Sequence, residues 1–196
     1  MCSEAGHELD TSVCHCRGPD RRSLRQRGNG RLKKDLERWL KQDQGSDARF
    51  TTMIDLYAYP KDAPGYRDRL SSEPYRRVAG LERALESDIA SQRFVPYIQL
   101  HEFETLLYAD MSRWSTLLLD SSREIQQLAD SVSGFSNVEL IDDGETTAPS
   151  KRILGAIPRY DKVASGALLA LEIGLPTIRE KCAHFNEWLS RLERLA

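Results

Sequence analysis

The chain has 196 residues, of which 40% are hydrophobic and 30% charged, and its formal net charge is -2. This length and apolar content suit one globular domain with a hydrophobic core. The charge gives no global basic field that would indicate nucleic-acid binding, and no apolar run is long enough to span a membrane. The N-terminus lacks the apolar stretch of a signal peptide, so we expect a cytoplasmic protein.

The first 30 residues differ in composition from the rest. They combine Gly18-Pro19 and Gly28-Asn29-Gly30 with several arginines and few apolar side chains, which predicts a flexible segment. Three of the four cysteines lie there, but only one residue separates Cys14 from Cys16, which is not the usual spacing of a zinc site. We expect a single domain over residues 31–196.

The apolar pattern from residue 31 onward predicts alternating helices and strands. In chain order it predicts a helix over 31–43, a strand over 50–57, a helix over 73–91, a strand over 94–100 and a helix over 101–110. Later elements are helical, apart from a short strand or extended link over 138–141. This order favours an α/β fold in which a small, mostly parallel sheet is flanked by helices and followed by a helical C-terminal third. Pro96 favours an edge or a bulge, and two strands are fewer than a stable sheet usually needs.

Both predicted strands end on acid. Asp55 closes the first, while Glu102 and Glu104 follow the second. The carboxyl ends of neighbouring parallel strands open into one crevice, where carboxylate oxygens can hold a divalent metal ion. Burying Asp55 is costly unless it is paired or coordinated, so a metal site and a structural salt bridge both remain open.

The two glutamates are not equivalent. On a helix, residues two apart point about 160° away from each other, so Glu102 and Glu104 cannot both face one ion from a helix. With a helix start near His101, Glu102 lies in the first turn, closest to the strand, and is the favoured ligand. The helix dipole also favours acids there whatever their function. Lys151, at a predicted helix start, either compensates a nearby phosphate or carboxylate or is a solvated surface lysine.

Five segments carry a resemblance to a known family: Thr51–Tyr57, Pro64–Tyr66, Pro96–Tyr108 with its string His-Glu-Phe-Glu, Ala148–Arg152 and Tyr160–Lys162. From about Arg31 to the C-terminus the sequence resembles the prokaryotic family catalogued as domain of unknown function 4276 (DUF4276). Its members are similar to Toprim-like domains, which bind magnesium through acids at strand ends and cut or rejoin nucleic acid. Some members are found beside ATPases of anti-phage systems.

The resemblance implies roles for four residues. Asp55 matches the acid of the central strand, Glu102 and Glu104 match the next acidic cluster, and Lys151 matches a basic residue beside the scissile phosphate. We therefore expect a nuclease with Mg²⁺ (or Mn²⁺) held by Asp55 and Glu102, and with Glu104 as general base if the junction stays extended. Its partners would be DNA or RNA and an ATPase protein, with no membrane.

The sequence departs from the family pattern in one respect, and two functions other than a nuclease are also consistent with it. Family members usually open with an apolar strand that ends in Glu-Gly, and this chain is expected to lack that strand and the first metal ligand. A non-catalytic module would instead dock on an ATPase, using Asp55 and Glu102 in salt bridges and, as interface, the C-terminal third and the tyrosine-rich loop over residues 58–72. A nucleotide-processing enzyme would use the same acids on a small molecule.

Overall fold

The computed structural model describes residues 21–68, 73–141, 144 and 147–195. Helix α1 spans Arg21–Gln42 and so begins ten residues before the helix start predicted at residue 31. A glycine inside a helix costs only about 1 kcal/mol, and the Asn29 N–H donates to Asp62 Oδ1 at 2.8 Å, which ties this turn to a loop. Residues 1–20, with Cys14 and Cys16, lie outside the described part.

Two parallel strand pairs, each a two-stranded sheet, follow one another along the same two chain segments, and we call them together the sheet. β1 (Phe50–Thr51) pairs with β3 (Phe94–Val95), and β2 (Ile54–Asp55) pairs with β4 (Ile98–Gln99). Between the pairs, Pro96 has no N–H, and the Tyr97 N–H donates to Thr52 Oγ1 at 3.1 Å in place of a backbone carbonyl. The predicted strands and their parallel order are confirmed, but each strand consists of two pieces.

The side of β3 and β4 that faces away from β1 and β2 carries no strand among the described residues. Backbone groups of alternate residues point to the same side of a strand. On this open side the Phe94 N–H donates to the Ser91 carbonyl at 3.1 Å, Pro96 has no N–H, and the Ile98 N–H donates to Glu82 Oε1 at 2.8 Å. The predicted edge position of Pro96 is confirmed, and the N–H groups of this edge are already used.

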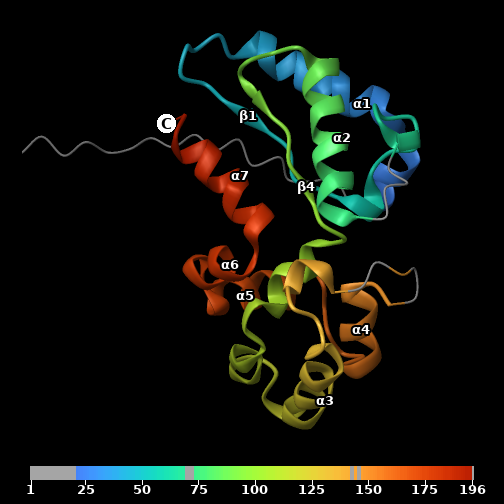
Figure 1. Cartoon of the computed structure of the whole chain (residues 1–196), viewed down its shortest axis with the longest axis vertical. Helices are drawn as coiled ribbons and strands as arrows, with labels where there is room; N and C mark the ends of the chain where they lie inside the picture. The colour runs from blue at the N-terminus through green and yellow to red at the C-terminus, as the bar shows by residue number, and fades with distance from the viewer. Residues whose placement is uncertain (1–20, 69–72, 142–143, 145–146, 196) are drawn as a thin grey trace, which may run out of the picture.

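Helices cover both faces of the sheet (Figure 1). α1 and α2 (Pro74–Ile89) lie on one face and α7 (Ala183–Glu193) on the other. Successive strand residues point to opposite faces, so Ile98 joins the core beneath α2, while Tyr97 stacks on Trp188 of α7 with ring centroids 4.4 Å apart. Both faces are therefore buried, as is usual for parallel strands.

The remaining described elements are helical. They are the 3-10 helices η1 (Leu56–Ala58), η2 (Tyr66–Asp68), η3 (Phe103–Thr116), η4 (Leu119–Ser121) and η5 (Val138–Leu140), and the α-helices α3 (Ser122–Val132), α4 (Pro149–Ala156), α5 (Ala164–Ile173) and α6 (Leu175–Lys181). The C-terminal part surrounds a second hydrophobic core built on Trp114, Leu107 and Ile153. In the described part of the chain, no helix has the length and apolar character needed to cross a membrane.

Two predicted elements need correction. The helix expected over 101–110 is the 3-10 helix η3, which begins at Phe103 and is interrupted at Asp110, where φ is -151°. The strand or extended link expected over 138–141 is instead the turn η5, because the Asn137 side chain accepts the Glu139 N–H at 2.8 Å.

Candidate functional site

Three acids lie at or just after the carboxyl ends of β2 and β4: Asp55, Glu102 and Glu104. We call Asp55 and Glu102 the acidic edge. Asp55 lies opposite Gln99 in the parallel register, and its Oδ1 accepts the Phe103 N–H at 2.9 Å. Phe103 stands between the two glutamates in the sequence, so this hydrogen bond joins the end of the first strand to the acidic junction after the second. The two acid-ended strands are neighbours, as predicted.

His101 makes the turn from β4 into the junction. It is fully buried, and its φ of 61° lies in the left-handed region that favours glycine. Its carbonyl accepts the Tyr57 N–H at 3.3 Å, and its Nδ1 lies 3.5 Å from the Tyr57 hydroxyl. A non-glycine residue in this conformation costs about 1–3 kcal/mol, and such strain clusters at functional sites. This turn immediately precedes Glu102, whose carboxylate reaches the start of α4.

Glu102 lies just outside η3 in extended conformation, with φ -146° and ψ 163°, and not in a helical first turn as predicted. Its Oε2 accepts the Ser150 N–H at 3.0 Å, at the start of α4, and its Oε1 lies 3.9 Å from Lys162 Nζ. The positive end of a helix and an ammonium both stabilise a carboxylate. Glu102 therefore joins the strand end, α4 and the segment before α5, and its side chain remains 13% exposed.

Glu104 is in the first turn of η3 and is fully buried. Burial raises the pKa of Tyr108 well above its usual range; the charge of Arg152 opposes this rise, while those of Glu104 and Glu102 add to it. The Tyr108 hydroxyl donates to the Pro149 carbonyl at 3.0 Å. Glu104 thus lies inward of the acidic edge, and burial separates it from any substrate in solvent.

Lys151 is exposed at the first turn of α4, directly after Ser150, whose N–H holds Glu102. Ser150 itself is fully buried, and its Oγ has no hydrogen-bond partner among the described residues. Residue-level reasoning missed Lys162, because no local pattern indicates its approach to a glutamate 60 positions earlier. Its only signal was the matching segment Tyr160–Lys162.

The chemistry of the acidic edge suits a hard divalent cation. Asp55 and Glu102 offer oxygen donors, and each is oriented by a backbone N–H. In the part of the chain that the structure describes, no three His, Cys, Asp or Glu side chains are arranged to hold an ion by themselves. Mg²⁺ commonly uses one or two carboxylates and completes its shell with water and substrate phosphate. This donor set therefore fits Mg²⁺ better than a metal that needs an all-protein cage.

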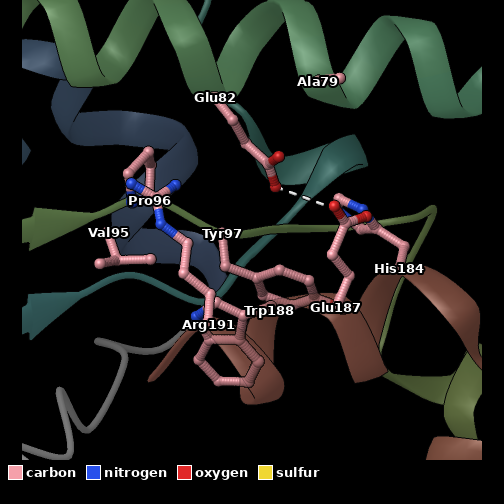
Figure 2. A pocket seen from close by; sticks show the side chains of 9 residues that line it. All are labelled: Ala79, Glu82, Val95, Pro96, Tyr97, His184, Glu187, Trp188 and Arg191. Carbon is pink, nitrogen blue, oxygen red and sulfur yellow. Dashed lines mark hydrogen bonds and ion pairs between the residues drawn. The ribbon is translucent and has the colours of Figure 1, made fainter. Parts of the chain in front are cut away.

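A separate concavity of about 150 Å³ lies beside the open side of β3 and β4, between α2 and α7 (Figure 2). Glu82 projects into it from α2, and His184, Glu187 and Arg191 from α7. His184 Nε2 lies 3.0 Å from the Glu82 Oε1 that also accepts the Ile98 N–H. Burial by itself lowers the pKa of His184, but the hydrogen bond to Glu82 and the charges of Glu82 and Glu139 outweigh it, so the pKa is raised.

Glu139 explains why this region is structural. It is fully buried; its Oε2 accepts the Tyr75 hydroxyl at 2.9 Å and the His184 N–H at 3.0 Å, and its Oε1 accepts the Phe185 N–H at 3.2 Å. The carboxylate thus caps the N-terminus of α7 and binds α2 to it. These contacts use the polar groups to connect helices, which leaves the acidic edge as the candidate functional site.

Fold and site together define an α/β protein whose parallel strands end at a cluster of oriented carboxylates. The chain belongs to the family described as domain of unknown function (DUF4276), whose family model matches residues 8–193. The match begins upstream of Arg31, where the resemblance was first expected to start. No curated protein and no solved structure matches the chain.

Proposed function

We propose that this protein is a metal-dependent nuclease that hydrolyses phosphodiesters of DNA or RNA at the acidic edge. The hydrogen bond from the Phe103 N–H to Asp55 carries the proposal, because it joins the acid-ended strands at their carboxyl ends. Ligands of open α/β sheets bind in the crevice at that end. The expected similarity to Toprim-like domains supports the same reaction class.

Asp55 and Glu102 would hold the ion. When bound there, Mg²⁺ (or Mn²⁺) polarises a phosphodiester and lowers the pKa of a coordinated water. The N–H groups of Phe103 and Ser150 hold the two carboxylates in orientation, in the way that outer partners orient metal ligands.

The cations beside the edge would act on the substrate. Lys151 is exposed next to the start of α4, where its ammonium can offset charge that develops on the phosphate. Lys162 lies near Glu102 and adds positive charge to the same wall. Glu104 would be a positioning residue beneath the edge, because a general base must reach the substrate or its water, and this carboxylate is fully buried.

The test is plasmid nicking with Mg²⁺ or Mn²⁺ by the full chain. We expect Asp55→Ala and Glu102→Gln to lower the metal-dependent rate by about two orders of magnitude, since the first removes a ligand and the second removes the charge of a ligand. Glu187→Ala is the matched control, because it removes an exposed carboxylate from the other concavity. Nicking by Asp55→Ala at the wild-type rate would contradict the proposal.

A metal titration separates this proposal from a non-catalytic module that docks on an ATPase partner. Bound Mg²⁺ or Mn²⁺ raises the melting temperature of a protein that binds it only when folded. We expect this rise in the wild type and not in Asp55→Ala. Absence of the rise in the wild type would favour the docking module.

A further inference from the structure

Helix α5 is apolar on two opposite faces. Its inner face, with Gly166, Leu169 and Ile173, is buried and packs against η3. On the other side Leu168 is 52% exposed and Leu171 is 77% exposed. Glu172 is the only charged residue between Ala164 and Ile173. A helix that is apolar all round is normally covered on both sides.

The exposed side has the spacing of a helix-packing seam. Ala164, Leu168 and Leu171 follow one another on α5 at i, i+4 and i+7, and Leu175, 49% exposed, lies beyond the non-helical Gly174 at the start of α6. We call these four residues the leucine face. Apolar side chains at alternating steps of four and three line one side of a helix and interdigitate with a second helix that carries the same spacing. Exposed apolar patches of this kind mark interaction sites.

The rim of the leucine face is acidic. Asp161 and Glu172 are exposed at the two ends of α5. Hydrogen bonds from the N–H groups of Ala164 and Val163 hold the pKa of Asp161 below its usual range, so its charge persists. The nearby cations are turned to partners within the chain: Lys162 toward Glu102, and Arg179 to Glu193 and Asn186. Lys181 is paired with the adjacent Glu180.

We propose that the leucine face binds an amphipathic helix of another protein whose apolar seam is flanked by Lys or Arg. Helices dock in this manner through anchors at i, i+3, i+4 and i+7, and opposite charge at the rim favours the correct partner. A second copy of this chain would bring Asp161 and Glu172 against the same acids, which disfavours self-pairing. This surface lies on α5 and α6 and is independent of the proposed nuclease chemistry.

The probes are two fluorescent synthetic peptides of about 18 residues, roughly five helical turns. Both carry leucines at the seam positions; one has Lys at the flanking positions and the other has Glu. By fluorescence anisotropy with the full chain, the Lys peptide binds, and the Glu peptide binds at least about tenfold more weakly. Leu168→Ser with Leu171→Ser abolishes binding, whereas Leu119→Ser, which alters a leucine 74% exposed on another element, leaves it unchanged.

Glu172→Lys keeps the test decisive if the double variant does not fold, because it reverses one rim charge without altering the seam. It weakens the Lys peptide about threefold to tenfold and strengthens the Glu peptide. Three results overturn the proposal: equal binding of both peptides, no binding of the Lys peptide by the wild type, and a dimer in sedimentation analysis that Leu168→Ser with Leu171→Ser dissociates. The last result would make the face a contact between copies of this chain.

Discussion

Two groups of carboxylates accept backbone N–H groups at helix starts, yet they differ in burial. Glu139 beneath α7 is fully buried, and each of its oxygens has a hydrogen-bond donor. At the acidic edge, Asp55 is half-buried and the Glu102 side chain is 13% exposed, although each also accepts one backbone N–H. The same contact therefore fixes one acid inside the fold and orients the others toward a ligand. Solvent access distinguishes the two uses, and mutations can separate them.

The largest expected effect comes from Glu139→Gln. The substitution replaces the carboxylate that accepts hydrogen bonds from the Tyr75 hydroxyl and from two N–H groups at the start of α7. The single oxygen of an amide cannot accept all three hydrogen bonds. We expect the free energy of unfolding to fall by about 3 kcal/mol, measured by urea denaturation. The exposed Glu187→Gln should change it by less than about 0.5 kcal/mol. A small effect at Glu139 would remove the distinction between the two groups.

Asp55→Asn is expected to have a smaller effect on stability and a larger one on metal response. Its amide oxygen can still accept the Phe103 N–H, so the cost should be about 1 kcal/mol, the difference between a charged and a neutral acceptor. The rise of the melting temperature with Mg²⁺ should disappear. Loss of more than about 3 kcal/mol would show instead that Asp55 is structural in the same sense as Glu139.

Substitutions at two glycines test the packing beside the acidic edge and on α2. A Cβ at Gly166 would lie 2.9 Å from the Tyr160 hydroxyl oxygen and 3.7 Å from Phe103 Cε1, next to the acidic edge. Gly166→Ala should therefore destabilise by about 1 kcal/mol despite its better helix propensity. At Gly80, on α2, a Cβ meets nothing within 4 Å, so Gly80→Ala should stabilise by about 0.5–1 kcal/mol. Thermal or urea unfolding of both variants gives the comparison, and equal shifts would contradict it.

The smallest expected effect is a pH dependence from His184. Its pKa is raised in the folded state, so the stabilisation it gives is fully present below its ordinary value of 6.5 and is lost as pH rises through the folded pKa. Urea unfolding measured from pH 6 upward should show this loss in the wild type and a flatter profile in His184→Gln. The charged groups near the ring are Glu82, Glu139, Glu187 and Arg191. Because the ring is hydrogen-bonded to Glu82, Glu82→Gln should also flatten the pH profile of the free energy of unfolding. Parallel profiles of wild type and His184→Gln would contradict the assignment.

The local sequence pattern predicted those features that are determined by residues close together in the chain. The β-rich runs around Phe50 and Phe94 indicated the strands, their alternation with helices indicated parallel pairing, and the acids at their ends indicated the edge. The contact of Glu102 with Ser150 joins residues 48 apart, and no periodicity encodes it. The left-handed turn at His101 has no residue-type signal either, because surrounding contacts and not a glycine impose it. These two features decide where Glu102 points, so the junction was misjudged as helical.

The predicted start of α1 was wrong for a different reason. Gly28 and Gly30 have the weakest helix propensity after proline, and reading them as a break is correct for an isolated peptide. In the protein the helix continues through them, and the hydrogen bond from the Asn29 N–H to Asp62 adds a tertiary contact there. The helix thus continues through two glycines whose local preference against it is about 2 kcal/mol.

The N–H groups on the open side of β3 and β4 are already hydrogen-bonded within the chain, and this affects aggregation at high protein concentration. An exposed strand edge is a template on which further chains can polymerise into cross-β aggregates. Here the Ser91 carbonyl, Pro96 and the carboxylate of Glu82 together leave no free N–H at Phe94, Pro96 or Ile98. We therefore expect this edge to resist fibril growth. Loss of the Glu82 carboxylate would show first as turbidity or thioflavin binding on prolonged storage.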